Sequence, residues 1–452
     1  MNFARLNFSH GNHQSHKKLI KNIRAAEKKT SVPIAIMGDV RGPRIRLEGF
    51  DESCIQVKAG QELEFVINEK KLKDRQISID APKNLLKFLK AGHSVLIDDG
   101  RIEVKILKIT KNSFRAKVLE GGQLCEHKGL NFPNSDLNIP PISEKDKADL
   151  EFCVENNVEF IAMSFVKTAG DIKKIRDLIK KFEKKHKINN KQSIQVIAKV
   201  ERHEAVDNID KILEISDGIM VARGDLGLEM QPAQVPLAQK SLIDKANEAA
   251  KPVIVATQML DSMQQNKRPT RAEVSDVANA VIDHADALLL TNETAAGKHP
   301  ILVVKTMADI IKTTEDSEYD DKNLEPEAKC DESIDESISE VSRLLGEDVG
   351  AKLILAASLT GETGRLISHV RPNMPILVAT NNKRSWRQLN LSWGVGSFIL
   401  PTCKTIEELV KKSVGVIKKE KFAKKGDLIV VVAGEPVGRA GNVNLVEVRE
   451  IR

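Results

Sequence analysis

Long apolar runs are absent from this 452-residue sequence. Even the run Ile429–Ala433 falls far short of the roughly 18–20 apolar residues that a bilayer-spanning helix needs. Near the N-terminus, Arg5 and His10 interrupt any apolar stretch before it could form a signal peptide. We therefore expect a soluble, cytoplasmic protein with no membrane partner.

Closely spaced cysteines are also absent. The five cysteines, at positions 54, 125, 153, 330 and 403, are scattered along the chain without a C-x-x-C pair. This spacing argues against a disulfide framework and against a zinc site, and it fits a reducing compartment.

The sequence has little excess charge of either sign. Its 70 basic and 64 acidic residues give a net charge of +6, which is mild for a chain of this size. The basic runs Lys173–Lys191 and Lys411–Lys425 have helical spacing among apolar residues, so we interpret them as solvated helix faces. We expect no nucleic-acid partner. A hydrophobic content of 41% excludes wholesale disorder.

Strand-like and helix-like segments alternate along much of the chain. No G-x-G-x-x-G motif opens a helix, which argues against a dinucleotide-binding half-sheet. The period of about 20–36 residues from Ile161 onward fits the βα units of a (β/α)8 barrel. The seven predicted strands are Phe3–Phe8, Pro33–Val40, Glu159–Phe165, Gln195–Glu201, Gly218–Leu226, Pro252–Met259 and Ala287–Glu293.

These segments predict an α/β protein of three domains. A barrel of residues 1–42 and 137–315 would be one strand short, since we count seven strands and expect the first βα unit upstream of Met1. Residues 43–136 alternate apolar and polar positions between turns, which predicts an inserted all-β lid domain with a β-barrel fold. Residues 316–452 read as a C-terminal α/β regulatory domain with a central sheet.

Polar side chains occur at the C-terminal end of each predicted barrel strand, where the active sites of such barrels lie. Seven consecutive strand ends with ionisable or hydroxyl groups are more than contact with solvent requires. These residues are Arg5, Asn7, Ser9, His10, Asp39, Ser164, Lys167, Lys199, Glu201, Asp225, Thr257 and Glu293.

The residues on two neighbouring strands suggest a metal-assisted reaction. The carboxylates of Glu201 and Asp225 suit Mg²⁺ or Mn²⁺ held by few protein oxygens. Lys199 shares a strand face with Glu201, where its ammonium could stabilise a phosphoryl group, form a Schiff base, or simply pair with Glu201. The spacing alone leaves these roles of Lys199 open.

Seven motifs, in the expected order and spread over essentially the whole chain, closely resemble those of pyruvate kinase. They are Asn2–Gly11, Gly38–Arg46, Ile142–Asp146, Ala198–Glu201, Ser216–Gly227, Ala256–Ser262 and Arg268–Ala278. The resemblance implies phosphoryl transfer between phosphoenolpyruvate and ADP, giving pyruvate and ATP in the last step of glycolysis.

The resemblance also implies a role for individual residues. Lys199 would stabilise the transferring phosphoryl group, and Glu201 with Asp225 would hold the divalent metal. Thr257 and the amides of Gly224 and Asp225 would bind the substrate carboxylate. The phosphate would lie against Arg5, and the nucleotide against Asn7, His10, Arg46 and Lys145. The proton donor to the enolate stays open between Thr257 and a nearby water.

One departure from the family concerns potassium. Asn7, Ser9 and Asp39 remain from the family's monovalent-cation site, but Arg44 replaces its glutamate and Val40 its threonine. A fixed guanidinium at position 44 could supply the charge of K⁺ and would repel a bound K⁺. We therefore expect activity without K⁺, unless Arg44 points to solvent.

A second departure concerns regulation. Ser358–Thr363 resembles the family's effector loop, with Ser358, Thr360, Gly361 and Thr363 ahead of a predicted helix. The surrounding Trp386 and Asn442–Val443 do not follow the common pattern. A phosphorylated effector of open identity and an ordinary helix cap are the two interpretations.

Family resemblance implies a homotetramer, which nothing in the sequence fixes independently. Two other functions remain open at this stage. One is a catalytically impaired, metabolite-binding homologue. The other is a metal-dependent barrel aldolase that acts on pyruvate, against which the nucleotide-side matches argue.

Overall fold

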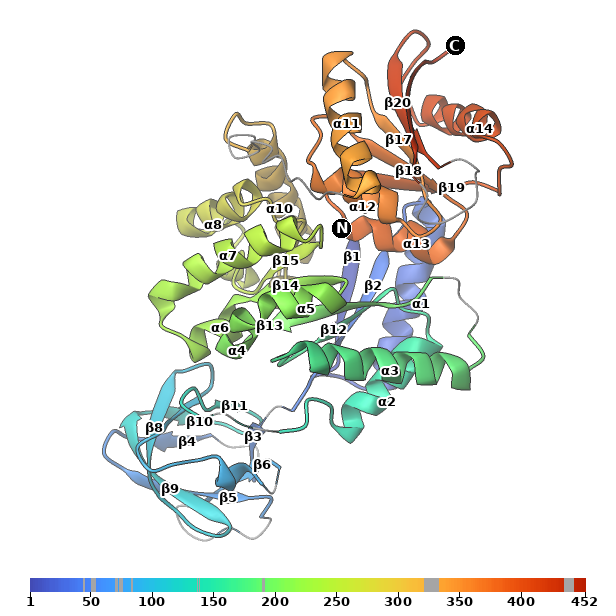
Figure 1. Ribbon diagram of the computed structural model, residues 1–452. Helices are drawn as coiled ribbons and strands as arrows, with labels where there is room; N and C mark the ends of the chain where they lie inside the picture. The colour runs from blue at the N-terminus through green and yellow to red at the C-terminus, as the bar shows by residue number, and fades with distance from the viewer. Residues whose placement is uncertain are drawn as a thin grey trace.

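Three units follow one another in the computed structural model, with the lid at one end and the C-terminal domain at the other (Figure 1). The structure describes the whole chain except residues 44, 50–53, 70–71, 73–75, 83, 136, 138, 189–191, 321–332 and 435–442. Separate hydrophobic cores lie in the barrel, the lid and the C-terminal domain. The exact domain boundaries stay a prediction.

All seven predicted barrel strands are present, and they form one parallel sheet. Among the described residues, the first and last strands form the two edges of this sheet. Short runs rich in valine and isoleucine pack on both faces, as parallel strands covered by helices require. In sheet order the strands are β1 (Phe3–Asn7), β2 (Ala35–Val40), β12 (Phe160–Met163), β13 (Gln195–Val200), β14 (Gly218–Ala222), β15 (Val253–Ala256) and β16 (Ala287–Leu289).

Amphipathic helices cover the outer face of the sheet. In α3, Ile172, Ile175 and Ile179 recur at helical spacing and are buried. The helices are α1 (His13–Thr30), α2 (Glu144–Glu155), α3 (Ala169–Lys185), α4 (His203–Asp207), α5 (Ile209–Ile215), α6 (Arg223–Glu229), α7 (Val235–Glu248), α8 (Arg271–Ile282), α9 (Asn292–Ala295) and α10 (Pro300–Glu315).

The pattern over residues 205–215 predicts one helix, but the structure has two, α4 and α5. Asn208 leaves the helical conformation between them, with φ −103° and ψ 13°. Its side-chain amide donates to the carbonyl oxygens of Lys167 and Glu204. An asparagine that bonds to neighbouring backbone competes with helix hydrogen bonds, which explains the break.

The lid is a closed β-barrel, as expected for the inserted segment. Its core contains the stacked rings of Phe65 and Phe114, whose centroids lie 4.9 Å apart. The lid strands are β3 (Ile45–Glu48), β4 (Ile55–Val57), β5 (Glu62–Ile67), β6 (Gln76–Asp80), β7 (Ser94–Ile97), β8 (Ile102–Ile109), β9 (Ser113–Glu120), β10 (Gly122–Leu124) and β11 (Gly129–Asn131). Of these, β4 and β10 form a separate pair beside the barrel.

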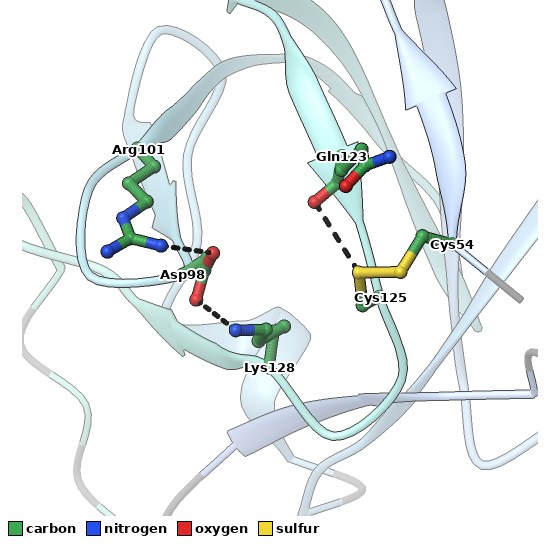
Figure 2. The surroundings of a disulfide bond; sticks show 6 residues. All are labelled: Cys54, Asp98, Arg101, Gln123, Cys125 and Lys128. Carbon is green, nitrogen blue, oxygen red and sulfur yellow. Dashed lines mark hydrogen bonds and ion pairs between the residues drawn. A yellow bond between two sulfur atoms is a disulfide. The ribbon is translucent and has the colours of Figure 1, made fainter. Parts of the chain in front are cut away.

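The lid contains a disulfide bond, so the prediction drawn from cysteine spacing, which argued against a disulfide framework, is wrong for one pair. Cys54 and Cys125 are bonded across a sequence separation of 71 residues (Figure 2). The cause is the pairing of β4 with β10, which brings the residue before one strand beside the residue after the other. Sequence spacing cannot reveal such a contact. Cys153 and Cys403 are free and buried, and Cys330 lies outside the described residues.

The C-terminal domain is a five-stranded sheet with helices on both faces. The strand order is β19-β18-β17-β20-β21, and all pairs are parallel except the last. The elements are α11 (Ile334–Asp348), β17 (Ile354–Ala357), α12 (Glu362–His369), β18 (Ile376–Thr380), α13 (Lys383–Gln388), β19 (Val395–Ile399), α14 (Ile406–Lys419), β20 (Leu428–Ala433) and β21 (Leu445–Glu450).

Helix α13 joins the C-terminal domain to the barrel. Arg387 donates to Glu27 of α1 at 2.6 Å and lies 3.3 Å from Glu159, which precedes β12. Leu391, three residues beyond α13, packs into the apolar cluster inside the barrel. The two domains therefore share both an apolar contact and an ion-pair network.

Candidate active site

Buried charges gather at the C-terminal end of β13. Lys199 and Glu201 occupy alternate positions, so their side chains share a face, and their charged atoms lie 2.7 Å apart. The Asp39 carboxylate, from β2, lies 3.2 Å from the Lys199 ammonium. All three residues are less than a tenth exposed. The result is a buried ammonium between two carboxylates.

Arg5 joins this cluster from β1. Strands β1 and β2 run in parallel, with Asn7 opposite Asp39. The Nε atom of Arg5 donates to Asp39 Oδ2 at 2.7 Å. About a fifth of the Arg5 side chain, 19%, stays exposed, so an anionic ligand can reach its guanidinium.

Burial and pairing with opposite charges shift the pKa values of these groups in opposite directions. Burial raises the pKa of Asp39, but Arg5 and Lys199 outweigh it and hold that pKa below its usual value. Burial lowers the pKa of Lys199, yet Asp39 and Glu201 raise it above the ordinary value. Burial raises the pKa of Glu201, and the charge of Asp225 adds to this against the effect of Lys199. A cation beside Glu201 and Asp225 would relieve that repulsion, so these residues fit a divalent metal.

Three further predicted residues come from the ends of β14 and β15. Helix α6 begins directly after β14 and carries Asp225 in its first turn. The Gly224 amide donates to Thr257 Oγ1 at 2.8 Å. Thr257 has a φ of 72°, a left-handed conformation that is rare for a β-branched residue. Arg223 donates to the Thr257 carbonyl oxygen at 2.7 Å and so helps to hold this backbone.

Residues expected on the nucleotide side come from two units. Asn7 ends β1, His10 follows it, and Lys145 Nζ donates to the carbonyl oxygen of the intervening Phe8 at 2.9 Å. Arg46 lies instead in the lid, on β3, which pairs with β6 and β11. The structure therefore brings three of the four together and leaves the fourth on the lid.

The remnant of the monovalent-cation site already has internal partners. The Ser9 amide donates to Asn7 Oδ1 at 3.1 Å. The Asp39 carboxylate is paired with two cationic side chains, those of Arg5 and Lys199. Arg44, the expected substitute for K⁺, lies outside the described residues.

Comparison with known proteins identifies the family. The families described as "Pyruvate kinase, barrel domain" and "Pyruvate kinase, alpha/beta domain" match residues 1–304 and 336–449. A pyruvate kinase of Geobacillus stearothermophilus is 42% identical over 458 residues, which span all of this chain and 76% of the relative. The chain belongs to the pyruvate kinase family.

Two other pyruvate kinases support this assignment. One from Sporosarcina psychrophila is 38% identical over 455 residues, spanning all of this chain and 76% of the relative. The crystal structure of a pyruvate kinase from Cryptosporidium parvum superposes with a TM-score of 0.91 at 36% identity. That match covers all of this chain and 91% of the other. The expected family and fold class are thus confirmed.

The predicted effector loop lies in the C-terminal domain of the chain, apart from the charged cluster in the barrel. Ser358 Oγ accepts from the Gly361 amide at 2.9 Å, and Thr360 Oγ1 accepts from the Glu362 amide at 3.3 Å. Thr363 is buried in the first turn of α12. These bonds hold the loop ahead of α12, and an effector role for the loop stays a prediction.

Sequence reasoning assigned no role to two residues that touch the cluster. Ser164 Oγ accepts from Lys199 Nζ at 2.8 Å, and the Phe165 amide donates to Glu201 Oε2 at 2.8 Å. Ser164 was recognisable as a polar residue at a strand end. A backbone amide such as that of Phe165 leaves no signal in a sequence.

Among the residues that the structure describes, no helix is both long and apolar enough to cross a bilayer. The cytoplasmic location inferred from the sequence stays a prediction.

Proposed function

We propose that this chain transfers a phosphoryl group from phosphoenolpyruvate to ADP, giving pyruvate and ATP. Family membership supports the reaction, and the observation that carries it to this chain is the buried Lys199 ammonium. It is held at 2.7 Å from Glu201 and 3.2 Å from Asp39. Phosphoryl transfer relies on fixed charges that stabilise a dispersed, multiply charged transition state, and a preorganised ammonium is such a charge.

In this proposal Lys199 acts on the phosphoryl group in transfer, and Arg5 binds the phosphate of the substrate. Both side chains meet at Asp39, which orients them through the contacts at 3.2 Å and 2.7 Å. Because Asp39 is paired with both, it stays ionised and keeps the two cations charged and in place.

Glu201 and Asp225 would hold Mg²⁺ or Mn²⁺. The raised pKa of Glu201, caused by burial and by the charge of Asp225, supports this role, because a divalent cation stabilises both carboxylates in their ionised forms. The bound metal would neutralise charge on the phosphoryl oxygens. Thr257 and the Gly224 and Asp225 amides would orient the substrate carboxylate. This role is supported by the proximity of the groups, since the Gly224 amide donates to Thr257 Oγ1, a bond that it would exchange for one to the carboxylate.

The nucleotide would lie between barrel and lid, against Asn7, His10, Arg46 and Lys145. The position of Arg46 on the lid supports a site that forms when the lid approaches the barrel. Closure would exclude water, so that the phosphoryl group passes to ADP and not to solvent.

We also propose that activity requires no K⁺. Val40 has no side-chain oxygen, and Asp39 already pairs with Arg5 and Lys199. A further cation at Asp39 would be repelled by both.

Two finer features complete the proposal. A homotetramer is supported by large apolar side chains that are exposed on α7, α10 and α11, since such side chains often mark interfaces. These are Leu237, Ile301, Leu302, Ile334, Val341 and Leu344. A phosphorylated effector at residues 358–363 is supported by the hydroxyl groups and the helix N-terminus there.

One coupled assay with phosphoenolpyruvate, ADP and Mg²⁺ tests the function. Pyruvate should appear in step with ATP. A chain that binds metabolites without turnover, or that cleaves carbon–carbon bonds of pyruvate derivatives without nucleotide, would contradict the proposal.

A further inference from the structure

The turn that follows β12 lies between the two halves of the charged cluster. Strand β12 pairs with β2 on one side and with β13 on the other. Ser164 and Phe165 follow its last residue, Met163. Their position is therefore between Asp39, at the end of β2, and Lys199, near the end of β13.

The Ser164 hydroxyl bridges the two strands. It accepts from Lys199 Nζ at 2.8 Å and donates toward Asp39 Oδ1 at 3.4 Å. Only 4% of Ser164 is exposed, so water cannot readily replace it. The ammonium also contacts Asp39 and Glu201, and the hydroxyl is the neutral partner that fixes its direction between them.

Phe165 holds the second functional group of β13. Its backbone amide donates to Glu201 Oε2 at 2.8 Å, while Glu201 Oε1 contacts Lys199. Phe165 has a φ of 55°, a conformation that is costly for a bulky residue and persists only where surrounding contacts impose it.

Gly42 packs against the same turn. It lies between the end of β2 and the start of β3, in the link from the barrel to the lid. A Cβ atom on Gly42 would lie 3.0 Å from Phe165 Cδ2 and 3.3 Å from the Ser164 carbonyl oxygen. The Gly42 amide donates to Asp146 Oδ1 at 3.0 Å, which anchors the link at α2. The lid link therefore lies close to the turn and leaves no room for a side chain at position 42.

We propose that Ser164–Phe165 is a positioning turn. The Ser164 hydroxyl sets the Lys199 ammonium, the Phe165 amide sets the Glu201 carboxylate, and contact with Gly42 keeps the turn in this conformation. The inference rests on the roles proposed above for Lys199 and Glu201. It adds residues that act through them and touch neither substrate nor metal.

The first test is Ser164→Ala in the full chain. Because Lys199 is proposed to act on the phosphoryl group in transfer, kcat should fall about tenfold, while KM for phosphoenolpyruvate should change less than about twofold. Affinity for Mn²⁺ without substrates, measured by electron paramagnetic resonance, should be unchanged because the Phe165 amide still holds Glu201. Ser164→Thr keeps the hydroxyl and should restore most of kcat.

Ser216→Ala is the matched control. Ser216 is 1% exposed, and its hydroxyl finds no hydrogen-bond partner among the described residues, so this change removes a buried hydroxyl away from the cluster. Its kcat should equal that of the wild type. Wild-type kcat in Ser164→Ala, or the same loss in Ser216→Ala, would overturn the role of Ser164.

Gly42→Ala tests the role of the Phe165 amide in positioning Glu201, by a measurement other than turnover. Its Cβ should displace the turn and weaken Mn²⁺ affinity about fivefold through Glu201. Unchanged Mn²⁺ affinity in a folded Gly42→Ala variant would overturn the proposed role of Phe165. An inactive wild type would contradict the proposed function and the turn together, whereas an active wild type with an unaffected Ser164→Ala variant would contradict the turn alone.

Discussion

The ammonium of Lys199 lies 2.7 Å from Glu201 Oε1, with both groups buried at the end of β13. Their pKa values are nevertheless both raised. Asp39 and Glu201 stabilise the charged lysine, whereas burial and Asp225 destabilise the charged glutamate. The lysine is therefore a fixed cation, and Glu201 is a carboxylate that a metal ion would stabilise. The first prediction concerns the fixed charge of Lys199.

Replacing Lys199 by methionine keeps the length and packing of the side chain and removes its charge. We expect kcat to fall by about 1,000-fold or more, since a fixed charge in a buried site stabilises the transition state far more than one in water. The coupled assay measures the loss, and circular dichroism checks the fold. Lys245→Met, at an exposed ion pair with Asp210, serves as control and should keep full activity. Retained turnover in Lys199→Met would refute its role.

Activity should not depend on potassium. In a low-salt assay with Mg²⁺ in excess, replacing K⁺ by tetramethylammonium should change kcat/KM by less than about twofold. The physical reason is that Arg5 and Lys199 already pair with Asp39, so another cation there meets repulsion. A steep, saturable K⁺ activation curve would contradict this prediction.

Acid should destabilise the barrel partly through Glu204. Burial raises the pKa of Glu204, but Arg202 and Lys167 outweigh it and lower that pKa from 4.5 to about 2. A depressed pKa in the folded state contributes stability above pH 4.5 and loses it as the pH falls toward 2, about 1–2 kcal/mol after screening by solvent. Glu204→Gln should therefore show a smaller drop in melting temperature between pH 5 and pH 3.

Calorimetry across this range measures the effect. Exposed Glu214→Gln is the control and should follow the wild type. An identical pH dependence in Glu204→Gln would show that the carboxylate gains nothing from its two cationic neighbours.

Arg387 should stabilise the contact between the barrel and the C-terminal domain. Removing it leaves buried Glu27 without the contact at 2.6 Å, although Arg24 remains 3.2 Å away. Loss of one partner from a buried pair costs about 3 kcal/mol, so Arg387→Ala should lower the melting temperature by several degrees. Arg101→Ala, at an exposed pair in the lid, should change it little. Equal effects of both variants would contradict the prediction.

The disulfide of the lid can be counted chemically. The chain has five cysteines, and Cys54 and Cys125 are bonded. Titration of the denatured chain with a thiol reagent should therefore find at least two more free thiols after reduction than before it. Closing a loop of 71 residues should stabilise the lid by about 4 kcal/mol, so a dithiol reductant should lower its unfolding temperature. Five free thiols in the purified chain would show that the bond does not form.

Part of this molecule is determined by local sequence. Short apolar runs, most of them rich in Val and Ile, predicted the seven described barrel strands, because burial on both faces of a parallel sheet demands such runs. Lys199 and Glu201 were predicted to share a face because side chains alternate along a strand. Short strands such as β3, β10 and β11 lack enough residues to show any period, and the structure alone reveals them.

What only the tertiary structure decided is which distant groups meet. The sequence by itself identified Arg5, Asp39 and Lys199 as polar strand ends, but their pairing through Asp39 depends on the strand order of the sheet. The bond between Cys54 and Cys125 depends on the pairing of β4 with β10. The contact of Phe165 with Glu201 depends on a backbone amide whose direction is set by packing. The periodicity of a sequence shows on which face of a strand or helix a residue lies. Long-range contacts arise only when separate elements pack together.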